Sequence, residues 1–143
     1  MVLVLTSRNG FLFLFAWEMM TLSSFFLVTR NDEKEEVRAA GWVTLVAAHL
    51  GTACLLALFV LLSRGGTLDF ADLGPGQAPA GGLFLLALAG FGVKAGLMPF
   101  HVWLPEAHPA APSPVSALMS GVMIKMGIYG ILRSLGWLGA PPA

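Results

Sequence analysis

The sequence predicts an all-α integral membrane protein with four transmembrane helices, the third of which is broken at a proline. Composition is the first observation: of 143 residues, 57% are hydrophobic and 11% are charged, against about 25% charged in a soluble domain. Distribution is the second: the hydrophobic residues gather in four runs, each close to the roughly 20 residues that a helix needs to cross a bilayer. Too few polar residues remain to cover a soluble globule, so we expect the runs to lie in lipid.

The four runs are expected to be helices because a backbone in hydrocarbon must satisfy its own hydrogen bonds. Strands of a membrane β-barrel would be about 10 residues long with alternating polarity, and the runs do not alternate in that way. We therefore predict one membrane domain over residues 1–143. Its helices are expected at about residues 11–29, 41–63, 81–104 (broken near 99) and 114–137.

The connections between the runs predict the orientation of the chain. The first connection carries Arg30, Lys34 and Arg38, whereas the Gly- and Pro-rich second connection, residues 64–80, carries only Arg64. Lysine and arginine gather in cytoplasmic loops. The first connection is therefore expected in the cytoplasm and the second on the outside.

Three charged residues, Glu18, Lys94 and Lys125, lie deep inside the hydrophobic runs. Each costs about 2.5–3.5 kcal/mol at a helix centre, so such groups should face the bundle interior and pair with opposite charges. We predict that Glu18 faces Lys94. A buried lysine next to a carboxylate can change its protonation state when that partner moves, as a proton relay requires. A static ion pair that locks two helices together is the alternative, and the residues leave both open.

Two prolines follow Lys94 in the third run. Pro99 lacks a backbone donor and clashes with the preceding turn, so we predict a helix break between Met98 and His101 and expect Pro105 to break the helix as well. Carbonyl groups freed in this way are tolerated inside protein or facing a water-filled cavity, so we expect His101 to lie in a polar cavity. A simple kink is the alternative, because prolines are frequent in membrane helices.

The histidines His49, His101 and His108 are candidate proton carriers, because the unperturbed imidazole titrates near pH 6.5. For His49, hydrogen-bonded packing inside an apolar helix is the alternative. A metal site at His101, Glu106 and His108 is not predicted, since their spacing does not match H-E-x-x-H and Pro105 separates them. We find no cofactor motif and expect no cofactor, no metal and no redox or catalytic centre. A net charge of zero argues against nucleic acid as a partner.

Three of the four tryptophans lie near the ends of the hydrophobic runs. We interpret Trp42, Trp103 and Trp137 as anchors at the membrane–water interface, where tryptophan is enriched. Trp17 lies within a run and has no such interpretation.

The segment from Lys94 to Pro112 carries the most specific pattern in the chain, K-x4-P-x-H-x-W-L-P-x-A-H-x-x-A-P. It resembles the antiporter-like, proton-conducting subunits of respiratory complex I and of Mrp antiporters. The continuation SALMSGVMIK, which ends at Lys125, and the segment AWEMM-x-LSS around Glu18 look closest to the branch of hydrogenase-4 component B and formate hydrogenlyase.

The resemblance implies both a fold and a set of roles. In that family a glutamate on the fifth transmembrane helix pairs with a lysine on a broken seventh helix, and a lysine or histidine on the eighth continues the proton path. Glu18, Lys94 and Lys125 match those positions. The four runs would then be the fifth to eighth helices of a larger fold, and the chain a fragment of a longer subunit.

The function that this resemblance implies is proton translocation in the cell (inner) membrane. The chain would belong to a hydrogenase-4-like or NADH-quinone oxidoreductase-like complex, with other membrane and peripheral subunits as partners. A subunit of a multi-subunit cation/proton antiporter, a non-conducting membrane scaffold and a membrane metalloenzyme are the alternatives. The buried charges argue against the scaffold, and the missing ligand spacing argues against the metalloenzyme.

Overall fold

The computed structural model of the chain describes residues 1–31, 33–63, 66–75 and 78–139. These residues form helices and an isolated antiparallel β-bridge between Asn9 and Asp69, without a strand. Four helical stretches are long and apolar enough to cross a membrane, which confirms the predicted fold class. They span Gly10–Val28, Glu35–Leu62, Ala80–Ala110 and Ser113–Trp137. Arg64, which entered the prediction of orientation, lies outside the described residues, and that orientation stays a prediction.

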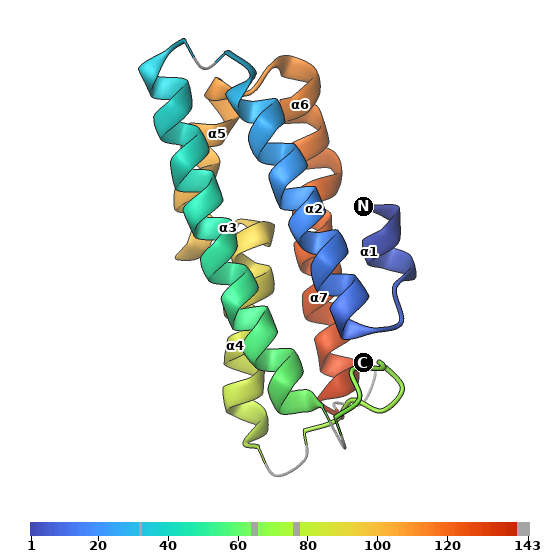
Figure 1. Cartoon of the computed structure of the whole chain (residues 1–143). Helices are drawn as coiled ribbons and strands as arrows, with labels where there is room; N and C mark the ends of the chain where they lie inside the picture. The colour runs from blue at the N-terminus through green and yellow to red at the C-terminus, as the bar shows by residue number, and fades with distance from the viewer. Residues whose placement is uncertain (32, 64–65, 76–77, 140–143) are drawn as a thin grey trace.

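The first two spans form an antiparallel hairpin, α2 (Gly10–Val28) and α3 (Glu35–Leu62) (Figure 1). A short helix, α1 (Val2–Thr6), runs beside α2. Helix α2 begins where the Asn9 side chain accepts a hydrogen bond from the Phe11 backbone N–H at 2.9 Å. The hairpin presents the polar groups of α2 and α3 to the third span.

Helix α3 begins six residues before the predicted start at residue 41, at Glu35. The prediction followed the hydrophobic run, and the first turns of α3 are polar. Their two carboxylates, on Glu35 and Glu36, lie at the positive end of the helix dipole, where negative charge stabilises a helix. The helix therefore extends beyond its hydrophobic part.

The third span is broken, as predicted, but the break begins earlier than Pro99. Helix α4 (Ala80–Ala95) ends at Gly96, whose φ of 66° lies in the left-handed region that glycine adopts without strain. A 3₁₀ turn, η2 (Phe100–Trp103), and helix α5 (Leu104–Ala110) follow. The helix has thus already ended three residues before Pro99.

Pro105, predicted as part of the break, instead lies in the first turn of α5. The missing N–H of a proline needs no partner at that position, and its fixed φ suits the start of a helix. Pro105 therefore begins a helix and does not interrupt one.

The fourth span is continuous and contains a π-helical turn. Helix α6 (Ser113–Leu118) passes through η3 (Met119–Met123) into α7 (Ile124–Trp137). Helix α7 packs closely against α4, because Gly127 leaves room for the α4 backbone. A Cβ atom added at Gly127 would lie 2.5 Å from the Ala95 nitrogen.

Two of the three predicted interfacial tryptophans are buried in the bundle. Trp103 is 2% exposed and Trp137 is 8% exposed, so the interpretation of these two as anchors is wrong. Trp137 packs at a ring distance of 5.4 Å against Phe59 of α3. Trp42 is 62% exposed, and its role as an anchor stays a prediction.

Candidate functional site

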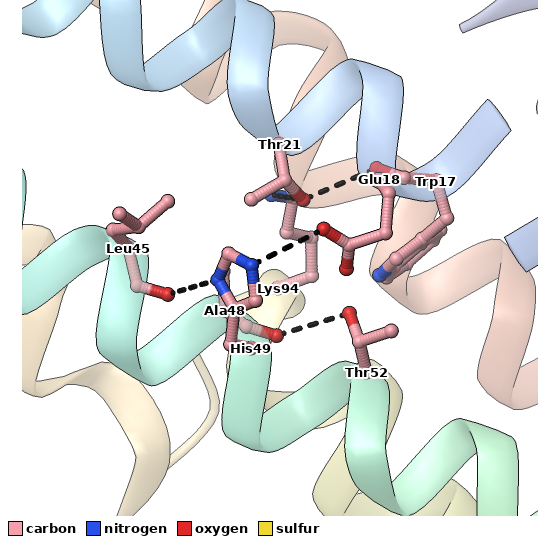
Figure 2. Close-up of polar contacts among 8 residues, drawn as sticks. All are labelled: Trp17, Glu18, Thr21, Leu45, Ala48, His49, Thr52 and Lys94. Carbon is pink, nitrogen blue, oxygen red and sulfur yellow. Dashed lines mark hydrogen bonds and ion pairs between the residues drawn. The ribbon is translucent and has the colours of Figure 1, made fainter. Parts of the chain in front are cut away.

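A polar cluster lies where α2, α3 and α4 meet (Figure 2). Its centre is Lys94, which is only 4% exposed although it is the penultimate residue of α4. The carbonyl end of a helix carries partial negative charge, so this position favours a cation. Because the helix breaks directly after Lys94, the ammonium group lies inside the bundle and away from the ends of the third span.

The hydrogen-bond partner of Lys94 is a neutral hydroxyl. Its Nζ donates to Oγ1 of Thr21 at 2.9 Å, and that hydroxyl donates to the Trp17 carbonyl oxygen at 3.1 Å. Thr21 is 2% exposed. Thr21 was not among the predicted site residues, although its position three residues after Glu18 places both on one face of α2.

Glu18 turns toward α3. Its Oε2 lies 3.6 Å from Nε2 of His49, and its Oε1 is buried without a hydrogen-bond partner in the described part of the chain. Glu18 interacts electrostatically with Lys94, but the described residues contain no direct ion pair between the two. The predicted Glu18–Lys94 pair is therefore corrected: the Thr21 hydroxyl occupies the position next to the ammonium group, and the carboxylate meets His49 instead (Figure 2).

His49 connects the cluster to the outside of the bundle. Its side chain is 53% exposed, while that of Glu18 is 28% exposed. The imidazole Nδ1 lies 2.9 Å from the Leu45 carbonyl oxygen one turn earlier in α3. The ring is thus oriented by its own helix, with Nε2 toward Glu18.

Trp103 supports the broken end of α4. Its indole N–H donates to the Val93 carbonyl oxygen at 2.6 Å, and the Gly96 N–H donates to the same oxygen at 3.2 Å. The last carbonyl groups of a helix lack partners within that helix. Trp103 supplies one of these partners and so fixes the backbone beside Lys94.

His101 and His108 lie on the far side of the break. His101 is half-buried on η2, which packs against α3, and its Nδ1 is buried without a hydrogen-bond partner among the described residues. The polar cavity expected around His101 stays a prediction. His108 is half-buried, and its Nδ1 lies 2.6 Å from Oγ of Ser116, which links α5 to α6. Among the described residues, no hydrogen bond or ion pair joins either histidine to Lys94, Glu18 or Thr21.

Lys125 lies on the outside of the bundle, so its predicted place in the interior is wrong for this chain. Its Nζ donates to the Gly121 carbonyl oxygen of the preceding turn at 2.9 Å, and its side chain is exposed. The buried face of α7 includes Met126, Gly127 and Gly130. Successive helix residues differ by about 100° in direction, which places Lys125 outside that face.

The fold and this cluster together define a multi-pass membrane protein that holds a lysine, a glutamate and a histidine at a break in one of its helices. Residues 7–140 match the family described as NADH:quinone oxidoreductase/Mrp antiporter, transmembrane. The chain belongs to that family.

Three relatives illustrate the range of this similarity. Hydrogenase-4 component B of Escherichia coli is 51% identical over 93% of this chain, and formate hydrogenlyase subunit 3 of the same organism is 38% identical over 95%. NAD(P)H-quinone oxidoreductase chain 4 3 of Picosynechococcus is 35% identical over 91%. The chain spans only 20%, 22% and 25% of the lengths of these three relatives, respectively.

Proposed function

We propose that this chain is a proton-translocating part of a membrane subunit in a hydrogenase-4-like or NADH-quinone oxidoreductase-like complex. The observation that carries the proposal is Lys94, an almost fully buried lysine at a helix break with a neutral hydrogen-bond partner and a carboxylate nearby. The similarity to subunits of such complexes supports it. Redox chemistry in other membrane and peripheral subunits would drive translocation, and the complex would lie in the inner cell membrane.

The neutral partner matters because a relay lysine must both gain and lose a proton. A lysine locked to a carboxylate would break an ion pair on losing its charge, at a cost of several kcal/mol in a buried site. The Thr21 hydroxyl can accept a hydrogen bond from an ammonium group and can donate one to a neutral amine. The site can therefore hold Lys94 in both protonation states, which favours the relay over the static pair.

The proposed path extends from the cluster to the remaining titratable groups. Glu18 and His49 lie on the α2–α3 side of Lys94, and His101 and His108 follow on η2 and α5. Lys125, which is exposed on α7, exchanges protons with groups in the rest of the subunit. The assignment of these residues to the path rests on their chemistry and on the matching family pattern.

Two substitutions of Lys94 test the proposal in the full-length subunit. Lys94→Ala should abolish most proton translocation while the complex still assembles, because a carboxyl left alone can bind a proton. Lys94→Arg should fail as well, since arginine does not lose its proton in proteins. Translocation and complex yield are measured in the same membranes, with Lys34→Ala, outside the membrane-spanning part, as the control. Near-normal translocation by Lys94→Arg would contradict the relay, and reduced assembly of Lys94→Ala with tolerated arginine would favour a static pair.

Cation/proton antiport is the second candidate, because the family to which the chain belongs includes Mrp antiporters. Transport of sodium ions in membranes that hold the full-length subunit separates the two. Sodium movement that is coupled to proton movement and lost in Lys94→Ala would favour the antiporter.

A further inference from the structure

We propose that Glu18 and His49 share a single proton and that His49 is the group from which Glu18 receives it. This inference rests on the proposed function and deepens it. Its basis is the 3.6 Å contact between Glu18 Oε2 and His49 Nε2, together with the hydrogen bond that fixes the other side of the imidazole ring.

The tautomer of His49 follows from its contact with Leu45. A carbonyl oxygen only accepts hydrogen bonds, so the 2.9 Å contact requires that Nδ1 of His49 carries a proton and donates it. In the neutral imidazole the other nitrogen, Nε2, then carries a lone pair. That lone pair faces the Glu18 carboxyl group (Figure 2).

The number of protons between Glu18 Oε2 and His49 Nε2 follows from comparing the three possible cases. With none, a lone pair faces a carboxylate oxygen, and the two repel each other. With two, an imidazolium faces a neutral carboxyl group, so the pair places a net positive charge close to Lys94. With one, either a carboxyl O–H faces the Nε2 lone pair or an imidazolium faces the carboxylate, and in both arrangements the two groups attract each other across the 3.6 Å that separates them.

The burial of Glu18 Oε1 also supports one shared proton at the contact with His49. This atom is buried and has no hydrogen-bond donor in the described part of the chain. A buried carboxylate oxygen without a donor is costly, because the charged group has lost its hydrogen bonds to water and gained none from the protein. A proton shared with His49 reduces the charge on the carboxylate and so reduces this cost.

The exposure of the three groups gives the step a direction. His49 is 53% exposed at the surface of the bundle, Glu18 is 28% exposed, and Lys94 is 4% exposed in the interior. In the proposed step the N–H bond at His49 Nε2 breaks as an O–H bond forms at Glu18 Oε2, and the imidazole becomes neutral. His49 thus supplies protons from outside this four-helix unit, and Glu18 passes them on toward Lys94.

The first test is His49→Gln in the full-length subunit within its complex. Glutamine can hydrogen-bond to Glu18 but cannot carry a proton, so translocation should fall by at least about tenfold, toward the loss expected for a missing acid–base group. Leu50→Gln, which places the same side chain at the neighbouring position, 64% exposed, is the matched control and should leave translocation unchanged. Normal translocation by His49→Gln would overturn the proposal.

The second test does not depend on the assembly of a variant at His49. Solid-state nuclear magnetic resonance of isotope-labelled histidine in the wild-type complex should show His49 with a protonated Nδ1. The Nε2 signal should shift in Glu18→Gln, whose amide donates to Nε2 in place of the shared proton. An unprotonated Nδ1, or an Nε2 signal indifferent to Glu18→Gln, would overturn the proposal.

Lys94→Ala, measured in parallel, separates the proposed role of His49 from the proposed function of the chain. If Lys94→Ala stops translocation and His49→Gln does not, the proposed function stands and the role of His49 is wrong. If neither variant affects translocation, the proposed function itself fails.

Discussion

At the scale of single residues, Thr21 gives Lys94 a hydrogen-bond partner that carries no charge. A hydroxyl lies where a carboxylate was expected, and it holds the ammonium group without neutralising it. The electrostatic partner, Glu18, remains close enough to act on Lys94 and has a second contact of its own in His49. Thr21 therefore supplies the hydrogen bond to Lys94 and Glu18 supplies the opposite charge, and the two side chains lie one turn apart on α2.

Thr21→Val tests this separation with a side chain of nearly the same shape. Valine leaves Lys94 Nζ buried without a hydrogen-bond acceptor, which costs about 1–3 kcal/mol or more for a charged donor. Proton translocation should fall strongly, and Thr21→Ser, which keeps the hydroxyl, should restore it. Translocation rate and complex yield of both variants are compared in the same membranes. Equal translocation by valine and serine would show that the hydroxyl has no part in the relay.

The residues differ in how far the sequence predicted them. Glu18 and Lys94 stand out because any charge inside a hydrophobic run is costly, and the structure places both at one site. Thr21 could not be recognised, because threonine is neither rare nor costly in a membrane helix. Its role depends on how α2 rotates toward α4, and that rotation is fixed by packing between the helices. Lys125 shows the opposite error, since a costly charge was assumed to be inside and lies outside.

At the scale of elements, the end of α4 is the feature that builds the site. A proline predicted the break, but Gly96 ends the helix and Trp103 holds the end in place. The sequence has 17 glycines, and nothing in it marks Gly96 as one that adopts a left-handed conformation. The helices themselves were predictable from hydropathy, except where polar turns extend α3 beyond its hydrophobic part.

Trp103→Phe removes the indole donor and keeps the aromatic ring. The Val93 carbonyl oxygen then loses its 2.6 Å hydrogen bond, at a net cost of about 0.5–1.5 kcal/mol. We expect a modest loss of thermal stability and a larger loss of translocation, because the backbone beside Lys94 is no longer fixed. Thermal unfolding and translocation are measured together. Trp42→Phe, at a position 62% exposed, should change neither, and an equal effect of both substitutions would argue against the positioning role.

At the scale of the whole molecule, α4 packs against both α3 and α7, so the third span contacts the helix before it and the helix at the end of the chain. Figure 1 shows the four spans side by side. The contact between α4 and α7 depends on Gly127, which faces the α4 backbone, and on Gly130, which faces the Phe91 ring. The cluster around Lys94 is therefore enclosed by helices that are far apart in the sequence. Such packing could not be read from hydropathy, which shows that a helix is apolar but not which helix it meets.

Gly127→Ala should weaken this packing. The added Cβ atom would lie 2.5 Å from the Ala95 nitrogen, and a backbone atom cannot move aside as a flexible side chain can. Overpacking of this kind costs about 1–3 kcal/mol, so complex yield and melting temperature should fall. Gly121→Ala is the matched control on the same span, since no atom lies within 4 Å of its added Cβ. Equal stability of the two variants would contradict the close contact.

The position of the break also sets how much of the membrane voltage lies between Lys94 and each side of the membrane. With Ala80 taken as the membrane edge, the rise of α4 carries Lys94 about 21 Å inward, roughly two thirds of the way across a core of about 30 Å. A unit charge that crosses the whole membrane gains or loses about 2.3 kcal/mol per 100 mV. A proton that reaches Lys94 from the Ala80 side crosses about two thirds of that voltage, and one from the α5 side about one third. In the proposed relay, the protonation of this lysine would therefore respond to membrane potential, and the position of the break would set how strongly it responds.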